Sequence, residues 1–172
     1  MSKRAAVFKY LDKQQIPFEV HEHPPVLTVE EALPYWKDID AAHCKNLFFR
    51  NHKGNKHYLM ILDYRQLLNI RDLEQRLKQG KISFASPPRM EKYLGLSAGS
   101  VSAFGIINDH ENHVHLFIDA SLQAAERISF HPNENNATLV ISFASFIRFL
   151  ESSGNSYEFI TLYEPGQQSS SF

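Results

Sequence analysis

The sequence predicts an α+β domain with a mixed, largely antiparallel sheet and surrounding helices. Apolar and polar residues alternate in several short segments, and two of these flank the polar loop 51–56, which contains a glycine and predicts a hairpin. Segments with helical spacing of apolar residues are interspersed irregularly, which argues against a regular βαβ repeat. A chain of 172 residues fits one domain with a sizeable core better than two small ones.

Helix caps and prolines place the elements of the first half. Residues 3–15 have amphipathic helical spacing, and Pro17 ends that helix. Thr28 followed three residues later by Glu31 resembles a capping box and predicts a short helix, with Pro34 near its end. The other predictions here are strands at 18–21, 46–50 and 57–63, a helix at 68–79, a short apolar segment at 82–84, and a helix at 87–94 that Gly95 terminates.

The second half begins with a loop of small residues at 99–105. The predictions that follow are strands at 114–119, 128–131 and 138–142, a helical turn at 120–125, and a closing helix at 143–151. From Ser152 onward glycine, serine and glutamine dominate. We therefore expect the domain to span residues 1–152 and residues 153–172 to form a flexible tail.

Charge and cysteine usage limit the compartment and the partners. Eighteen Lys and Arg oppose nineteen Asp and Glu, a balance that argues weakly against a protein that coats long nucleic acid but allows a local basic patch. No DNA partner is expected. The single cysteine, Cys44, excludes a disulfide within the chain and favours a reducing compartment. The N-terminus lacks the apolar run of a secretory signal, and no stretch approaches the roughly 20 apolar residues of a spanning helix. A cytoplasmic protein with no membrane partner is expected.

Nine histidines raise the question of a metal site. His21 and His23 are two residues apart, as are His113 and His115, so each pair would share one face of a strand. Catalytic zinc usually needs a third protein ligand and structural zinc a fourth, and the sequence contains neither HExxH nor CxxC. We interpret the histidines as surface or half-buried side chains and expect no metal and no cofactor.

Cys44, between His43 and Lys45, has two interpretations. A thiolate beside two cations could be nucleophilic, but neighbours on an extended strand point to opposite sides, so the partner would have to be a distant histidine. The alternative is an incidental thiol that packs as a small apolar group. Lys45 starts the apolar segment 45–50 and must either reach water or find an anion. The sequence contains no GxSxG elbow, no Walker loop and no GxGxxG fingerprint.

Several motifs occur in a particular order over roughly residues 4–150. They are His23-Pro24-Pro25-Val26, Thr28-Val29-Glu30-Glu31-Ala32, Lys45-Asn46-Leu47-Phe48-Phe49-Arg50, Gly54-Asn55-Lys56-His57-Tyr58-Leu59, Ile82-Ser83-Phe84-Ala85-Ser86, Tyr93-Leu94-Gly95-Leu96, Gly99-Ser100-Val101, Phe104-Gly105-Ile106-Ile107-Asn108-Asp109, Phe130-His131-Pro132-Asn133 and Ala137-Thr138-Leu139. In this order they resemble the YbaK-type aminoacyl-tRNA deacylases, relatives of the editing domain inserted in bacterial prolyl-tRNA synthetase. The Lys-Asn-Leu-Phe and His-Pro-Asn segments are most similar to the freestanding ProX/PrdX type.

The resemblance implies a catalytic machinery made largely of backbone. It implies that Lys45 contacts the terminal adenosine or its phosphate, and that the loop of Gly99, Ser100 and Val101 holds the aminoacyl ester. The family loop usually has the form Gly-x-x-x-Pro, whereas this chain has Ala103 at the last position, which is less rigid. An aminoacyl ester is already activated, so backbone N–H groups that stabilise the oxyanion would suffice without a side-chain nucleophile.

The resemblance also implies a pocket for the amino acid, shaped by Asn46 and His131, and we add Val20 as a third candidate wall. Such a pocket would exclude proline by size and admit alanine, which the synthetase cannot reject strongly because a missing methylene contributes only about 1–3 kcal/mol. A few phosphate contacts would hold the acceptor end of the tRNA. The candidates for these contacts are Lys45, Arg50, Lys53, Lys56, Arg89 and Lys92.

The function that the resemblance implies is trans-editing, in which mischarged alanine is removed from tRNA(Pro). The expected partners are the acceptor end of mischarged tRNA(Pro) and, as a second candidate, prolyl-tRNA synthetase. Three alternatives stay open at this point. The chain could deacylate another amino acid such as cysteine or serine, it could be a non-catalytic tRNA-binding module in which Ala103 marks the loss of activity, or it could be a thiol enzyme that uses Cys44.

Overall fold

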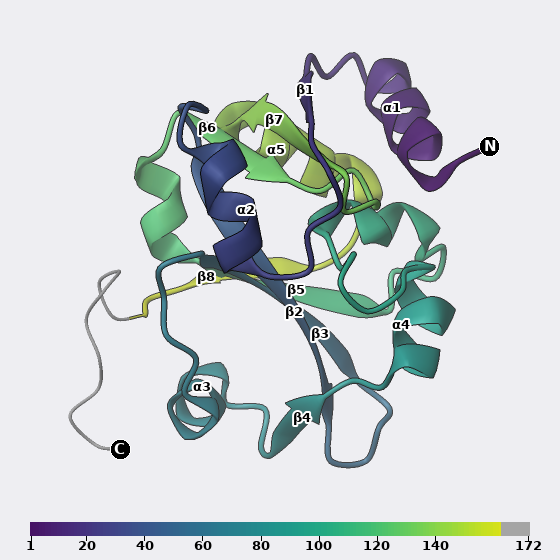
Figure 1. Ribbon diagram of the computed structural model, residues 1–172. Coiled ribbons are helices and arrows are strands. Elements are labelled where there is room, and N and C mark those ends of the chain that lie inside the picture. The colour runs from purple at the N-terminus through teal and green to yellow at the C-terminus, as the bar shows by residue number, and fades with distance from the viewer. Residues whose placement is uncertain (163–172) are drawn as a thin grey trace.

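The computed structural model describes residues 1–162, which fold around one eight-stranded sheet (Figure 1). The strands are β1 (Glu19–Glu22), β2 (Ala42–Asn51), β3 (His57–Asp63), β4 (Ile82–Phe84), β5 (Val114–Asp119), β6 (Arg127–Phe130), β7 (Ala137–Ser142) and β8 (Tyr157–Ile160). The α-helices are α1 (Lys3–Lys13), α2 (Val29–Trp36), α3 (Ile70–Leu77), α4 (Pro87–Leu94) and α5 (Phe143–Ser153), and the 3₁₀ helices are η1 (Ala103–Asn108) and η2 (Ala120–Ala124).

The sheet is mixed, in agreement with the predicted α+β class. Its strand order is β1-β7-β6-β2-β3-β5-β8, with β4 added by pairing with β2. Among the described strands, β2–β3, β2–β4, β1–β7 and β6–β7 pair antiparallel, whereas β2–β6, β3–β5 and β5–β8 pair parallel. The predicted hairpin over 51–56 is confirmed, and it joins the two long strands at the centre of the sheet.

Helices cover the central strands on both faces, so neighbouring residues enter different cores. On β2, Phe48 packs into a core shared with α1, η1, α4 and α5, whereas Phe49 packs into a core shared with α3. On β3, Leu59 packs into the same core as Phe48, and Met60 packs into the same core as Phe49. Successive strand residues point to opposite faces. Burial on both faces accounts for the complete burial of β3, which the sequence shows as a run of apolar residues.

The caps that the sequence suggests are present. The side chain of Thr28 accepts a hydrogen bond from the backbone N–H of Glu31 and begins α2, and the Glu31 carboxylate reaches back to the N–H of Leu27 at 2.8 Å. Gly95 ends α4 with a φ of 65°, a left-handed conformation that favours glycine. These local signals fix where α2 begins and where α4 ends, and both helices border the site described below.

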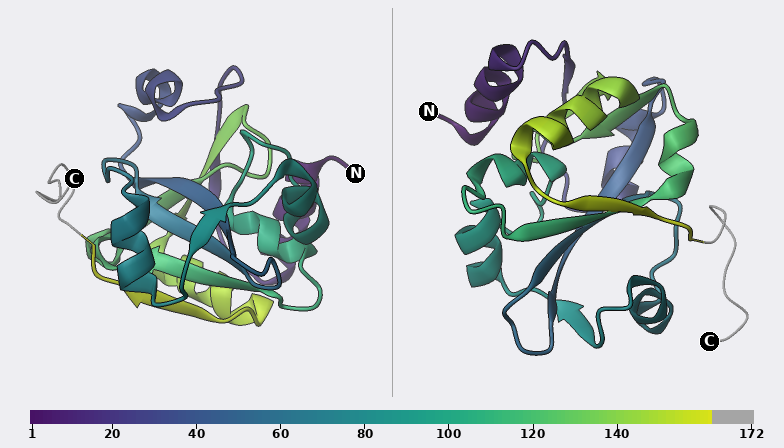
Figure 2. Two further views of the ribbon diagram at one scale, coloured as in Figure 1. Left: turned by 90° about the horizontal axis from the view of Figure 1, so that it is seen from below. Right: turned by 180° about the vertical axis from the view of Figure 1, so that it is seen from behind.

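The predicted tail boundary is wrong. Residues 157–160 form β8, which pairs parallel with β5 along Leu116–Asp119, and Figure 2 shows this strand beside β5 when the molecule is seen from behind. Asn155 precedes β8 and donates hydrogen bonds to the Asp109 carboxylate and the Val114 carbonyl. The short alternating segment was obscured by the surrounding Ser, Gly and Gln. Residues 163–172 lie outside the described part of the chain.

One edge of β2 is interrupted. β6 pairs with β2 at Ala42 and His43, and β4 pairs with it at 49–51. Between these two contacts, residues 44–48 have a strand partner only on the other edge, where β3 lies. This gap leaves the edge of β2 between His43 and Phe49 without a neighbouring strand, although the Phe48 carbonyl accepts a hydrogen bond from the N–H of Ala85. No helix within residues 1–162 is long and apolar enough to cross a membrane.

Candidate functional site

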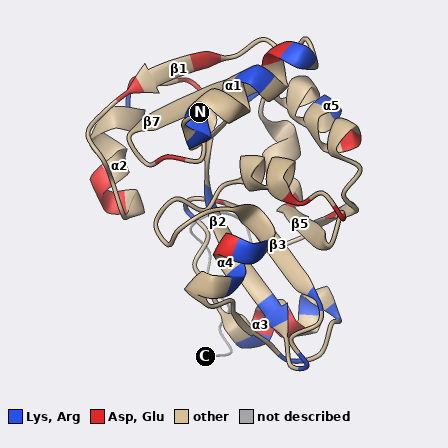
Figure 3. Cartoon of the chain, turned by 90° about the vertical axis from the view of Figure 1, so that its right-hand side faces the viewer, with Lys and Arg blue, Asp and Glu red and all other residues tan. Residues whose placement is uncertain are grey.

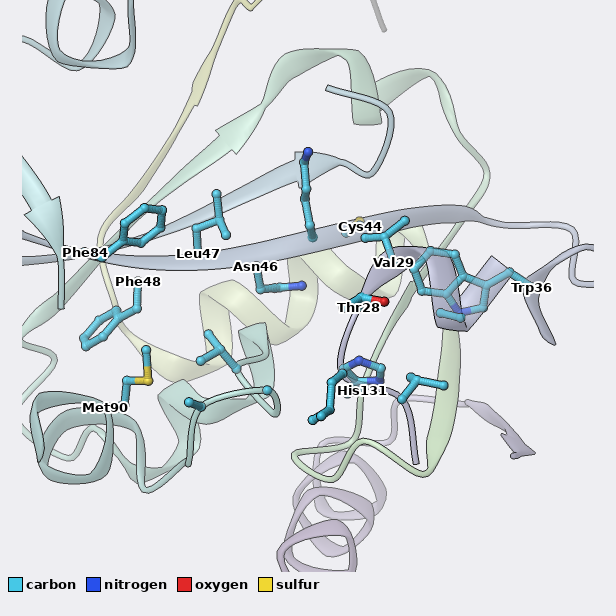
Figure 4. Close-up of a pocket in the computed structure, with 17 residues that line it drawn as sticks. Thr28, Val29, Trp36, Cys44, Asn46, Leu47, Phe48, Phe84, Met90 and His131 are labelled. Carbon is cyan, nitrogen blue, oxygen red and sulfur yellow. The ribbon is translucent and has the colours of Figure 1, made fainter. Parts of the chain in front are cut away.

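A cavity of about 390 Å³ lies at the interrupted edge of β2 (Figure 4). Its walls come from β2, from the segment that leads into α2 and α2 itself, from the loop before η1, from β4 and α4, and from the residue after β6. The lining residues are Val26, Leu27, Thr28, Val29, Ala32, Trp36, Cys44, Lys45, Asn46, Leu47, Phe48, Phe84, Met90, Ala98, Gly99, Val101 and His131. The cavity therefore joins segments that are far apart in the sequence, from Val26 to His131.

Asn46 connects the β2 wall to the loop wall. Its side-chain oxygen accepts a hydrogen bond from the backbone N–H of Ala103 at 3.1 Å. The amide NH₂ group donates no hydrogen bond within residues 1–162, and Figure 4 shows the side chain extending from β2 into the space beside His131. Asn46 is therefore held by its acceptor and offers its donors to the cavity.

The loop before η1 supplies a second set of donors. Gly99 has a φ of 86°, and together with Val101 it lines the cavity. Among the described residues the backbone N–H groups of Gly99 and Val101 donate no hydrogen bond, whereas the N–H of Ser100 is bonded to the carbonyl of Ser97. Two backbone N–H groups of this loop thus have no acceptor among the described residues.

Ser102 anchors this loop, a role that the sequence did not reveal. Its hydroxyl donates to the carbonyl of His131 at 2.6 Å and caps the start of η1 by accepting a hydrogen bond from the N–H of Phe104. Ser102 is fully buried. Since one hydroxyl ties the loop to the residue after β6, the positions of the loop and of His131 depend on each other.

The protonation state of His131 follows from its contacts. Its Nδ1 lies 3.2 Å from the carbonyl of Ala137, and because a carbonyl only accepts, Nδ1 carries the proton. Burial lowers the pKa of His131 from its ordinary value, partly offset by this hydrogen bond. The ring is therefore neutral near pH 7, and Nε2 keeps a free lone pair at the cavity wall.

Lys45 and Asn46 extend in opposite directions from β2, as alternation requires. The Lys45 ammonium donates to the backbone carbonyl of Gln66. Burial lowers the pKa of Lys45, although the Glu30 and Asp63 carboxylates oppose that shift. A lysine bound to one neutral carbonyl at a cavity wall can exchange it for an anion, since a charged acceptor binds an ammonium more strongly.

Cys44 lines the cavity but lacks the partners of a nucleophile. Burial, with a contribution from Asp63 and Asp119, raises the pKa of its thiol well above the ordinary value. The neighbouring His43 is bonded to Ser129 and to the carbonyl of Ile39. The thiol therefore stays protonated, and this environment does not support the thiol-enzyme interpretation.

Some predicted site residues lie away from the cavity. Val20 pairs with Leu139 and packs on the main core, Ala103 is fully buried, and Ser100 does not line the cavity. Arg50 and Lys53 lie where β2 meets the hairpin turn. Other lining residues were not predicted: Thr28, Trp36, Phe84 and Met90. Only packing brings these side chains to the cavity, and no motif marked them as site residues.

A group of cations lies at the hairpin end of β2, next to α4. Figure 3 shows Lys and Arg gathered there. We call Arg50, Lys53, Lys56, Arg89 and Lys92 the basic hairpin cluster. Arg89 donates to the carbonyl of Gly54 and to Nε2 of His57, both at 2.9 Å. This tie connects the hairpin to α4, the helix whose Met90 lines the cavity.

The positive charge of the basic hairpin cluster contributes to a lowered pKa of His57. Burial foremost, then the neighbouring His113 and the cations Arg89, Lys92 and Arg50, lower the pKa of His57 from 6.5 to about 4. Neutral His57 can accept from Arg89 and donate through Nδ1 to Nε2 of His113 at 2.9 Å. No group of three or more side chains suited to a metal ion occurs within residues 1–162.

The chain is similar to known proteins over most of its length. Residues 23–149 match the family described as "Aminoacyl-tRNA editing domain". The chain is 36% identical over 166 residues to the "Prolyl-tRNA editing protein ProX" of Acetoanaerobium sticklandii, with 94% of this chain and 99% of that protein covered. It is 31% identical over 155 residues to the "Prolyl-tRNA synthetase associated domain-containing protein 1" of Bos taurus, covering 88% and 91%.

A solved structure shares the fold. It is described as a candidate trans-editing enzyme for prolyl tRNA synthetase, and the similarity has a TM-score of 0.69 at 18% identity, with 95% of this chain and 99% of that chain covered. At this identity the similarity concerns the fold alone. It extends over the sheet and the helices that border the cavity, because nearly the whole of both chains is matched.

Proposed function

Because the chain belongs to the aminoacyl-tRNA editing domain family, we propose that it is a trans-editing hydrolase that removes alanine from mischarged tRNA(Pro). Membership of this family makes the chain an aminoacyl-tRNA deacylase. The choice of tRNA rests on the similarity to a prolyl-tRNA editing protein that matches over nearly its full length. The choice of alanine rests on the resemblance to the freestanding ProX/PrdX type. Prolyl-tRNA synthetase is the proposed second partner, suggested by the name of the Bos taurus relative.

The observation that carries the proposal is the convergence of unused hydrogen-bond donors on one cavity. Asn46, Gly99 and Val101 all line it, and the Asn46 amide and the N–H groups of Gly99 and Val101 have no acceptor among the described residues. When water attacks the ester carbonyl, negative charge develops on the carbonyl oxygen. Donors held in place before the reaction stabilise that charge, and a single such donor can contribute roughly 10²–10³-fold in kcat.

The rest of the reaction needs little from side chains. The bond between the carbonyl carbon and the ribose oxygen breaks, the ribose oxygen takes up a proton, and free alanine leaves. In this proposal the adjacent ribose hydroxyl orients the attacking water. The free lone pair of neutral His131 accepts a hydrogen bond from the substrate's α-ammonium group. Asn46 and His131 form the walls that limit the size of the amino acid, and Val20 drops out as a wall because it lies outside the cavity.

Lys45 and the basic hairpin cluster are proposed to hold the tRNA end. Lys45 lines the cavity and is bound to a neutral carbonyl that a phosphate can replace. Arg50 and Lys53 lie further along β2 and the hairpin, where they would meet phosphates beyond the terminal nucleotide. These contacts position the substrate and are not expected to discriminate between amino acids.

The experiment is deacylation of alanyl-, cysteinyl-, seryl- and prolyl-tRNA(Pro) by the wild type, by Lys45→Ala and by Lys9→Ala, a control at an exposed lysine on α1. Hydrolysis of alanyl-tRNA(Pro) alone, lost in Lys45→Ala and kept in Lys9→Ala, supports the proposal. Hydrolysis of another aminoacyl-tRNA keeps the reaction and changes the specificity. A wild type that binds tRNA but hydrolyses none of the four contradicts the proposal and favours a non-catalytic tRNA-binding module.

A second arm tests the role of the ribose. Alanyl-tRNA(Pro) whose adjacent hydroxyl is replaced by hydrogen should bind to the wild type but not turn over. Normal turnover of this substrate would remove the hydroxyl from the mechanism and would leave the choice of tRNA and of amino acid untouched.

A further inference from the structure

Phe84 exposes a large aromatic ring at the cavity. It belongs to the three-residue strand β4, lines the cavity, and is 51% exposed. One side of the ring stacks on Phe49, with ring centroids 4.7 Å apart and planes at 25°. Phe49 itself is completely buried. The core therefore holds the Phe84 ring in a fixed plane while about half of the residue stays accessible.

The position of Phe84 along β2 separates two polar regions. It lies opposite Phe49, whereas Asn46 is three residues away in one direction, about 10 Å along a strand. In the other direction, the next residue of β2 is Arg50 of the basic hairpin cluster. Figure 4 shows Phe84 at the opposite end of the cavity from Trp36 and His131. Along β2, an aromatic surface thus lies between Asn46 and the basic hairpin cluster.

The substrate has a matching order of groups. The acyl group is attached to the ribose of a terminal adenosine, the adenine base lies on the other side of that ribose, and the polyanionic chain continues beyond it. A base needs a flat apolar surface, and stacking on an aromatic side chain gives roughly a fivefold or greater gain in affinity. Leu47 lines the cavity beside Phe84 and adds further apolar surface next to the ring.

We propose that Phe84 is the stacking platform for the terminal adenine base, which positions the aminoacyl ester against Asn46 and the Gly99 loop. This role rests on the proposed function, since only a nucleotide-linked substrate presents such a base. Phe84 is a positioning residue, because it contacts the base and none of the reacting atoms. The simpler alternative is that Phe84 only shields Phe49 from water.

Two substitutions separate stacking from shielding. Phe84→Leu keeps an apolar cover over Phe49 but has no flat ring, and Phe84→Tyr keeps the ring. The control is Leu67→Ala, an apolar residue with 53% exposure that lies outside this cavity. Each protein is titrated with adenosine 5′-monophosphate and with ribose 5-phosphate by NMR, and kcat/KM is measured on alanyl-tRNA(Pro).

Stacking predicts that the wild type binds adenosine 5′-monophosphate more tightly than ribose 5-phosphate. Phe84→Leu should weaken adenosine 5′-monophosphate binding and lower kcat/KM, each by about tenfold, with ribose 5-phosphate binding unchanged. Phe84→Tyr and Leu67→Ala should behave as the wild type. Equal binding of the two ligands by the wild type, or wild-type behaviour of Phe84→Leu, would contradict the proposed stacking role of Phe84.

Failure here differs from failure of the proposed function. If the wild type hydrolyses alanyl-tRNA(Pro) and Phe84→Leu does so equally well, the platform is wrong and the deacylase assignment stands. If the wild type hydrolyses no aminoacyl-tRNA, the function fails, and the NMR titrations still decide whether Phe84 binds a base.

Discussion

The Asn46 side-chain oxygen lies 3.1 Å from the backbone nitrogen of Ala103, and it accepts the hydrogen bond that this nitrogen donates. A proline at position 103, which the family loop usually carries, has no N–H and could not donate it. Alanine at position 103 lacks the rigid ring of proline, but its N–H can donate the hydrogen bond to Asn46. The residue that departs from the family pattern, Ala103, is thus the one that holds the Asn46 side chain in place.

Replacing Ala103 by Pro tests this exchange. The substitution removes the donor and leaves the Asn46 oxygen without its partner, so we expect the free energy of unfolding to fall by about 1–2 kcal/mol and kcat to fall by several-fold. Thermal unfolding and single-turnover deacylation measure the two effects. In a double-mutant cycle with Asn46→Ala the two losses should be less than additive. Full additivity would mean that the bond does not contribute.

Asn46→Asp tests the acceptor oxygen and the donor NH₂ group of the Asn46 amide separately. The aspartate can still accept from Ala103, so the midpoint of thermal unfolding should stay close to that of the wild type. It loses the donor that faces the cavity and places a negative charge near the developing oxyanion, so kcat should fall by about 10²-fold or more. Retention of wild-type kcat in Asn46→Asp would exclude the amide from oxyanion stabilisation.

Gly99→Ala places a side chain where the backbone is left-handed. With φ at 86° the residue becomes strained, and its Cβ would come within 2.9 Å of the Leu27 side chain. Gly80→Ala is the matched control, because its φ is 75° and nothing lies within 4 Å of the added atom. Both variants should lose about 1–2 kcal/mol of stability. Only Gly99→Ala should lower kcat/KM, by about tenfold, because it moves the proposed donor loop.

Cys44 provides a test of the thiol alternative. Because its pKa is raised well above the ordinary value, the thiol is protonated near neutral pH and should resist iodoacetamide in the folded protein. Cys44→Ser should lower kcat by less than about tenfold, whereas loss of a true nucleophile costs roughly 10⁴-fold or more. Mass spectrometry after alkylation and a deacylation assay give the two readouts. Rapid alkylation that abolishes hydrolysis would restore Cys44 as a nucleophile.

His57 should make the fold sensitive to acid. Its folded pKa of about 4 lies below the unfolded value near 6.5. Between these pH values only the unfolded chain binds the proton, so the free energy of unfolding falls as the pH falls through this window, on the order of 1–3 kcal/mol in all. Urea unfolding from pH 7 to 4.5 should show a shallower loss for His57→Gln than for the wild type. His110→Gln, at an exposed residue, should keep the wild-type slope.

Local signals in the sequence predicted most of the elements. Thr28 with Glu31, Gly95 and the 51–56 hairpin are set by short-range chemistry, and the structure has each of them where it was predicted. The strand β8 was missed because four alternating residues carry little signal within a Ser- and Gly-rich segment. It becomes a strand only because the edge of β5 is available to it, and the sequence does not show that edge.

The residues of the cavity were predictable only in part, because packing between elements decides which side chains reach it. Lys45, Asn46, Gly99, Val101 and His131 were named through the resemblance, and all of them line it. Val20, Ser100 and Ala103 were named as well, but they do not line the cavity: Val20 packs against the core and Ala103 is fully buried. Phe84 and Trp36 could not be named, because their place depends on how β4 and α2 pack against β2. Residue type alone does not distinguish an aromatic side chain in the core from one at the mouth of a cavity.

The interrupted edge of β2 also limits how this protein can change. β6 holds the strand at Ala42 and His43, and β4 holds it again at 49–51. Between these fixed points an insertion or deletion of one residue would exchange the two faces, so that Asn46 would lose its hydrogen bond with the Ala103 N–H and Lys45 its hydrogen bond with the Gln66 carbonyl. Substitutions within this stretch adjust one contact at a time, whereas a change in its length would reverse the whole wall. Variants that alter amino-acid specificity should therefore arise here by replacement, at constant spacing between the two pairing points.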